Sequence, residues 1–204
     1  MTVNSRRQDN ATATQQALIK EAHALFSKQG FNYTSIDTIA LQARVSKGAF
    51  YHHFKTKKEM FIACYELQAK QVAQAISIKP SQDPWADTLA QSQAFLDFII
   101  RQKNSSIPLQ EVITVLGFDT WKKIDSSYTM GIILRALTRL EDHKLIKPYN
   151  TQLMAETLYG ILVNAAISLA SAKQKKQTYE QLADLITGFL NSLRVKCEPN
   201  CIYN

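Results

Sequence analysis

The chain has 204 residues, of which 46% are hydrophobic, and a formal net charge of +7. This composition is that of a globular protein with one domain, or with a small domain joined to a larger one, and it makes a membrane protein improbable because no apolar run approaches roughly 18 residues. No apolar stretch follows the polar N-terminus as a secretory signal would require, so we expect a cytoplasmic protein whose three cysteines stay reduced.

Positive charge is concentrated near the N-terminus. Residues 1–60 contain nine Lys and Arg and four Asp and Glu, which is +5 of the total +7. Basic segments attract the phosphates of nucleic acids. A phosphate-binding surface is therefore expected within the first 60 residues.

The first predicted helix covers residues 13–29. Its apolar residues recur at helical spacing and share one face. Thr12 or Thr14 can cap its first turn with a side-chain oxygen, and Gly30 is a natural stop.

Two short helices are predicted next, joined by a tight turn. Thr34 or Ser35 can cap the first of them, and Ser46 can cap the second, which runs through Phe54. Three helices of this size form the framework of a helix-turn-helix domain, whose last helix enters the major groove of DNA. The outer face of that helix carries residues that can contact bases, phosphates or sugars, namely Lys47, Gly48, Tyr51, His52 and Lys55.

A longer pattern runs through this segment. It consists of Gly30-Phe31, Thr34-Ser35, Ile39-Ala40, Ala43 and the run Val45-Ser46-Lys47-Gly48-Ala49-Phe50-Tyr51-His52-His53-Phe54-Lys55-Thr56-Lys57. Over about residues 12–60 the chain closely resembles the tetracycline-repressor (TetR) family of transcriptional regulators. The resemblance implies phosphate contacts from Thr34, Ser35, Tyr51, His52, His53 and Lys57. It also implies that Lys47, Gly48 and Ala49 lie against base edges.

The turn departs from the family pattern, because Arg44 stands where the family usually has Gly. A residue other than Gly is mildly strained at positive φ. Either the turn adopts another geometry, or Arg44 bears this strain and reaches a phosphate. We favour the second interpretation.

Residues 1–57 are expected to form the DNA-binding domain. Residues 58–196 are expected to form a larger helical domain that binds an effector and dimerises, and residues 197–204 a tail. No strand pattern is present, and only six Gly and five Pro interrupt the helical periodicity. Further helices are predicted over residues 58–76, 84–102, 108–116, 127–143, 151–172 and 178–193. The expected fold is therefore all-α with about nine helices.

The last two predicted helices are expected to form the interface of a homodimer. The first of them is more apolar and richer in small residues than one buried face requires, and the second carries an apolar stripe of its own. Two such helices from each chain would make a four-helix interface. A dimer places two recognition helices on a palindromic DNA site. The interface candidates are Leu158, Leu162, Ala165, Leu169, Leu182, Leu185 and Phe189.

A small-molecule effector is expected to bind among the middle helices. The candidates for its pocket are Trp85, Phe95, Phe98, Phe118, Trp121, Tyr128, Tyr159 and Asn164. Most of these are expected to be ordinary core, because an aromatic stripe at helical spacing is packing more often than pocket. Thr157, Gln110 and Arg135 are other polar residues that could orient a ligand, and none identifies it.

The sequence shows no catalytic, cofactor or metal-binding constellation, so we expect no enzyme, no cofactor and no metal. Phosphate-cradling glycine loops, G-x-S-x-G and H-E-x-x-H are all missing. Adjacent His52 and His53 would point to different sides of a helix, and Cys197 and Cys201 have no nearby His to complete a metal site.

These observations predict a sequence-specific DNA-binding regulator of a palindromic operator, and the family resemblance implies a repressor that a small-molecule effector releases. The alternative is a DNA-binding regulator that a corepressor or a protein partner controls, without an inducer pocket. A third hypothesis is a helical carrier or enzyme that merely retains the N-terminal domain. It predicts little salt-dependent affinity for DNA.

Overall fold

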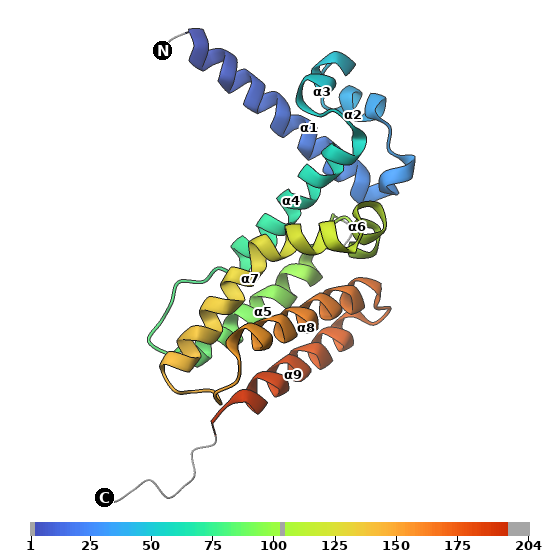
Figure 1. The fold of residues 1–204 in the computed structure, drawn as a ribbon. Helices are drawn as coiled ribbons and strands as arrows, with labels where there is room; N and C mark the ends of the chain where they lie inside the picture. The colour runs from blue at the N-terminus through green and yellow to red at the C-terminus, as the bar shows by residue number, and fades with distance from the viewer. Residues whose placement is uncertain (1–2, 103–104, 196–204) are drawn as a thin grey trace, which may run out of the picture. The chain divides into compact units, whose positions relative to one another are not determined.

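A computed structural model describes residues 3–102 and 105–195, which form nine α-helices and no strand (Figure 1). The helices are α1 (Val3–Tyr33), α2 (Ile36–Gln42), α3 (Lys47–His53), α4 (Lys57–Ile76), α5 (Pro84–Gln102), α6 (Leu109–Leu116), α7 (Phe118–Asp142), α8 (Thr151–Ser171) and α9 (Lys175–Leu193). The prediction of an all-α fold is confirmed. Cys197, Cys201 and the predicted tail lie outside the described residues.

The caps of the two short helices follow the sequence prediction. The Ser35 hydroxyl oxygen accepts a hydrogen bond from the Thr38 N–H at 3.0 Å, and the Ser46 hydroxyl oxygen accepts one from the Ala49 N–H at 3.1 Å. Each bond satisfies a backbone donor that a first helical turn leaves free. Of the two caps proposed for α2, the structure therefore selects Ser35.

Helix α1 begins earlier than predicted. It starts at Val3, and the hydroxyls of Thr12 and Thr14 donate to the carbonyl oxygens of the preceding turn instead of capping a helix start. Thr inside a helix commonly makes this bond, so its presence alone does not mark a beginning. The predicted stop at Gly30 is confirmed as a break, since Gly30 has a non-helical φ of 83° within the assigned span of α1.

Contacts within the chain group the residues into two compact units. The first contains the described residues up to Gln71 together with Gln102–Asp125, and the second contains Val72–Arg101 together with the described residues from Ser126. Helix α6 and the start of α7 thus pack with the helix-turn-helix helices. The chain passes between the units at three points, within α4, at the end of α5 and within α7.

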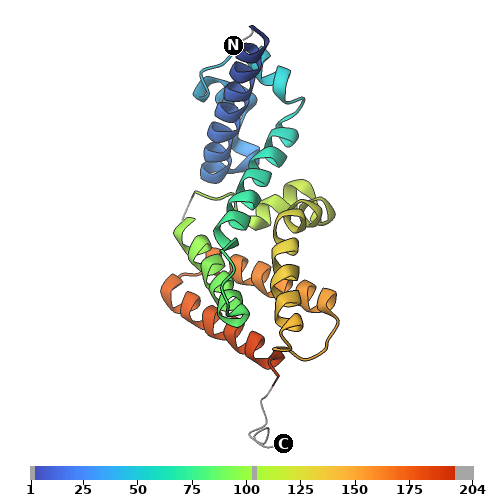
Figure 2. The same ribbon diagram turned by 90° about the vertical axis from the view of Figure 1, so that its left-hand side faces the viewer.

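Aromatic side chains form the core of the first unit. The ring of Phe26 lies 5.0 Å from that of Phe61, whose ring lies 5.1 Å from that of Phe31. Ile39 of α2 and Phe50 of α3 are fully buried as well. Burial of each such side chain contributes about 1.5–3 kcal/mol, which holds α2 against α1 and α3 against α2 in the N-terminal part of the chain (Figure 2).

The second unit contains the helical hairpin of α8 and α9, which lie side by side (Figure 1). Among the described helices, α8 alone is long and apolar enough to cross a membrane by length and composition, with a mean hydropathy of 1.5. A core helix meets the same criteria. Helix α8 supplies Leu158, Leu162 and Ala165 to the core of its unit, and its Leu169 is buried as well.

Candidate DNA-binding and effector-binding sites

The turn between α2 and α3 has the geometry of a Schellman motif. The Val45 N–H donates to the Ala40 carbonyl at 2.9 Å, and the Arg44 N–H donates to the Leu41 carbonyl at 3.1 Å. Arg44 has a φ of 56°, the left-handed conformation that normally favours Gly. The predicted strain at Arg44 is therefore present, and the turn keeps its geometry. The Arg44 side chain is exposed.

Lys47 stands on the first turn of α3 and points to solvent. Its Nζ lies 2.8 Å from Oδ1 of Asp37 in α2, and both side chains are more than half exposed. The hydrogen bond to Asp37, followed by the charge of that carboxylate, raises the Lys47 pKa. Lys47 is therefore a surface cation. Its ion pair with Asp37 is exposed to solvent and weak, so a DNA group can readily take the place of Asp37.

Tyr51 lies one helical turn after Lys47. Its side chain is 49% exposed, and its ring packs edge-on against buried Phe50 at 5.5 Å. This contact holds the ring while the hydroxyl remains accessible. Gly48, between them, has only the Ser46 hydroxyl near the position of a β-carbon, at 3.7 Å, so the backbone there is open to close approach.

The His pair ends α3. His52 is exposed and His53 is half-buried, with their ring centroids 5.0 Å apart. Burial, and secondarily the neighbouring His52, lowers the His53 pKa and favours its neutral form. Within the part of the chain that the structure describes, no group of three potential metal ligands includes either ring.

Two residues predicted to contact phosphate, Lys57 and Thr34, use their side-chain polar groups for hydrogen bonds within the first unit. The Lys57 ammonium donates to the carbonyls of Phe31 at 2.7 Å and Thr34 at 2.9 Å, and it lies 4.2 Å from the centre of the Phe31 ring. The Thr34 side chain is 1% exposed, and its hydroxyl donates to the Gly30 carbonyl at 2.8 Å. The Lys57 bonds could not be predicted from the sequence, because they depend on how α4 meets the end of α1, whereas the Thr34 bond is local to the end of α1.

The other DNA candidates gather around the α2–α3 turn and along α3. They are Ser35, Arg44, Ser46, Lys47, Gly48, Tyr51, His52 and Lys55, all exposed, with Ala49 half-buried beneath them.

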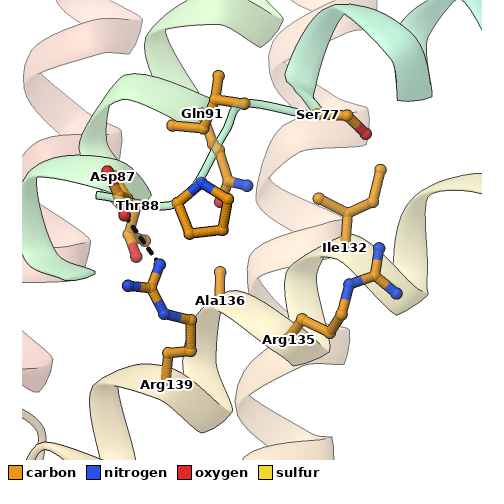
Figure 3. Close-up of a pocket in the computed structure, with 10 residues that line it drawn as sticks. Ser77, Asp87, Thr88, Gln91, Ile132, Arg135, Ala136 and Arg139 are labelled. Atoms are coloured by element: carbon orange, nitrogen blue, oxygen red, sulfur yellow. Dashed lines mark hydrogen bonds and ion pairs between the residues drawn. The ribbon is translucent and has the colours of Figure 1, made fainter. Parts of the chain in front are cut away.

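A pocket of about 280 Å³ lies in the second unit (Figure 3). It is lined by Ser77, Ile78, Pro80, Asp87, Thr88, Gln91, Ile132, Arg135, Ala136 and Arg139. Arg135 is the one lining residue that the sequence analysis singled out. The others lie on α5, α7 and the segment between α4 and α5. They are too far apart in the sequence to form a motif, so the sequence did not predict them.

A smaller cavity of about 30 Å³ adjoins this pocket and shares Thr88, Gln91, Ile132 and Ala136 with it. Among the aromatic candidates, Phe95 lines this cavity. The remaining lining is mostly apolar, comprising Ile76, Ser92, Ile133, Leu158 and Leu162.

The other ligand candidates are not among the residues that line these two cavities. Trp121 belongs to the first unit, where its indole N–H donates to the Tyr65 hydroxyl at 2.8 Å, and Phe118 beside it is 56% exposed. Trp85 is buried under the Arg194 guanidinium at 4.8 Å. The rest are buried Tyr159, half-buried Phe98 and Tyr128, and exposed Asn164.

The dimer candidates divide into two groups. Leu158, Leu162, Ala165 and Leu169 are at most 7% exposed, because they pack in the core of their own chain. Leu182 and Phe189 are half-buried against that core. Leu185 of α9 is 68% exposed, so it alone among the seven projects well into solvent.

A capped α3 on a tight turn, followed by a larger helical unit, defines a helix-turn-helix transcriptional regulator. A family profile described as "Bacterial regulatory proteins, tetR family" matches residues 18–64, and one described as "Tetracyclin repressor-like, C-terminal domain" matches residues 85–193. The chain belongs to the TetR family of bacterial regulatory proteins.

Individual relatives agree with this assignment. The chain is 32% identical to the transposon Tn10 TetC protein of Escherichia coli over 193 residues, which cover 94% of this chain and 98% of that one. It is 36% identical over 69 residues to the HTH-type transcriptional regulator AcrR of Shigella flexneri, covering 34% and 32% of the two chains. The crystal structure of a TetR-family regulator from Pectobacterium atrosepticum matches with a TM-score of 0.74 and 25% identity, covering 92% and 97%. As a member of this family, the chain is a DNA-binding transcriptional regulator and not an enzyme.

Proposed function

We propose that this regulator is a cytoplasmic homodimeric repressor, that α3 contacts a palindromic operator, and that a small molecule in the second unit releases it. The observation that supports this proposal best is the exposed face of α3. Lys47 and Tyr51 share that face, and two serine caps with a Schellman turn fix its orientation.

Different residues are assigned to bases and to phosphates. Lys47, Gly48 and Ala49 lie at the start of α3, where a recognition helix meets base edges. Phosphates are assigned to Ser35, Arg44, Ser46, Tyr51, His52 and Lys55, which are exposed around them. His53 and Lys57 are assigned to phosphate by the family resemblance, and Lys57 would have to exchange one of its carbonyl partners. Buried Thr34 is left out.

Dimerisation is assigned to the exposed surface of α8 and α9. Thr157, Gly160 and Asn164 of α8, with Leu185 and Gly188 of α9, are exposed in the single chain. Small residues allow close approach of helices, and Leu185 supplies an apolar contact. Leu158, Leu162, Ala165 and Leu169 are left out of this proposed surface, because they are buried within the single chain.

The effector would act by favouring one separation of the two recognition helices. A ligand that binds one conformation more tightly shifts the population toward it, and the DNA affinity changes by the same coupling free energy. The chain passes between the units three times, which provides covalent routes for this coupling. A pocket of about 280 Å³ supports an effector over a protein partner alone.

The proposal is tested by selecting fragments of the source genome with the purified protein. Wild type should enrich one short palindrome, and a Lys47→Ala, Tyr51→Ala double variant should lose it. Enrichment that the double variant retains would remove α3 from the contact surface.

The dimer is tested by measuring molecular mass in solution. Leu185→Glu should halve the mass because it places a charge in the interface, whereas Leu41→Glu should not, because Leu41 is 74% exposed on α2 of the first unit. An unchanged mass for Leu185→Glu would refute this interface.

A further inference from the structure

The proposed effector pocket contains three charged groups, two of which neutralise each other. The Arg139 guanidinium lies 2.8 Å from a carboxylate oxygen of Asp87, and it also donates to the Ser81 carbonyl at 2.9 Å. The Asp87 carboxylate accepts a further bond from the Ser81 N–H at 2.8 Å, and its pKa is lowered, first of all by Arg139. Asp87 is therefore ionised at neutral pH, and its charge is paired with that of Arg139.

Arg135 supplies the remaining charge. It lies one helical turn before Arg139 on α7, and Figure 3 shows both side chains at the pocket. Among the described residues no ion pair involves its guanidinium, and one nitrogen of that group lies 3.4 Å from the position that a β-carbon on Gly131 would take. The pocket therefore carries a net positive charge with unused donors.

The pocket changes from polar to apolar toward the interior. Thr88, Gln91, Ile132 and Ala136 line both the larger pocket and the small cavity behind it. Beyond them the small cavity reaches Phe95, Leu158 and Leu162 in the core. A ligand placed here would meet a cation at one end and hydrocarbon at the other.

We propose that the effector is a small organic acid, with its carboxylate on Arg135 and its apolar body directed toward Phe95. Arg suits this role, because its guanidinium donates two parallel hydrogen bonds to a carboxylate. The volume of about 280 Å³ lies near the lower end of small-molecule sites, roughly 300–1,000 Å³, which favours a small acid over a large amphiphile. This inference rests on the proposed function, in which the second unit binds an effector.

The test compares three matched probes by calorimetry on the full chain: 4-phenylbutyrate, its primary amide and 4-phenylbutylamine. The acid should bind about tenfold or more tightly than either analogue, since a charge-assisted bond strengthens only its complex. Arg135→Gln should abolish this preference. Lys176→Gln makes the same charge change on an exposed side chain of α9 outside the pocket, and it should preserve the preference.

Ala136→Leu tests the position of the ligand, because Ala136 lines both cavities and a larger side chain would fill the passage between them. It should weaken binding of the acid without changing the melting temperature by more than a few degrees. Equal affinity for the three probes, no binding of the acid up to millimolar concentration, or a preference that survives Arg135→Gln would each overturn the proposal.

Operator binding separates this inference from the proposed function. Without ligand, Arg135→Gln should bind the operator as wild type does. Release of wild type from its operator by a neutral molecule would overturn the organic acid and leave the proposed function intact. Failure of wild type to bind any DNA would contradict the proposed function itself.

Discussion

Replacing Arg44 by Gly should stabilise the protein. Arg44 has a φ of 56°, and a left-handed conformation costs a residue with a β-carbon roughly 1–2 kcal/mol. Gly removes that cost but loses about 0.5–1 kcal/mol more backbone entropy on folding. The expected net gain is therefore about 0.5–1 kcal/mol in the free energy of unfolding, or roughly 1–4 °C in melting temperature for a chain of this length.

Arg44→Ala is the matched control. It removes the same charge but keeps the β-carbon, so its stability should stay within about 0.5 kcal/mol of wild type. Urea denaturation of the three proteins measures the difference. If Arg44→Ala is as stable as Arg44→Gly, the gain does not come from the backbone, and the argument from strain is wrong.

The same two variants test whether Arg44 reaches a phosphate. Loss of one phosphate contact lowers the slope of log affinity against log salt by about 0.9. Both variants should show this decrease with the selected operator, because both lack the guanidinium. An unchanged slope in both would mean that Arg44 does not contact the DNA backbone.

Three further predictions concern ion pairs and hydrogen bonds in the structure. Asp37→Asn should raise DNA affinity several-fold at low salt, because it frees Lys47 and removes a negative charge that repels phosphates. Fluorescence anisotropy measures this affinity, and weaker binding by the variant would contradict the prediction. Glu111→Ala should lower the free energy of unfolding, measured by urea denaturation, by about 1–3 kcal/mol, because a Glu111 carboxylate oxygen accepts a hydrogen bond from the Phe31 N–H at 2.6 Å. Glu111→Gln keeps an acceptor oxygen, so its free energy of unfolding should fall less. The Tyr179 hydroxyl donates to Asp97, and burial followed by this bond raises its pKa to about 12 from an ordinary value of 10.0. A Tyr pKa that is raised on folding stabilises the native state below pH 10, and this stabilisation is lost as the pH rises to about 12. The difference in the free energy of unfolding between wild type and Tyr179→Phe should therefore shrink over that range. A difference that is independent of pH would contradict the prediction.

Local features of the fold could be predicted from the sequence. Ser35 and Ser46 cap their helices, and Arg44 takes up positive φ, because each outcome depends on backbone groups only a few residues away. The length of α1 was underestimated, because Thr12 and Thr14 can bond inside a helix as well as before it.

Long-range partners could not be predicted in the same way. The apolar residues of α8 recur at helical spacing, but spacing does not tell whether Leu158 meets its own core or a second chain. Lys57 bonds carbonyls at the end of α1, and Arg139 pairs with Asp87 on another helix. These partners are far apart in the sequence, so only the packed structure brings them together.

A specificity profile tests most directly whether Lys47 contacts a base. Affinities of wild type and Lys47→Ala are measured against every single-base variant of the selected operator. Lys47→Ala should lose roughly five- to 100-fold discrimination between bases at one symmetric pair of positions and keep its discrimination elsewhere. A uniform loss across all sequences would show that Lys47 contacts only phosphate, and it would contradict the assignment of α3 as the helix that distinguishes bases through this residue.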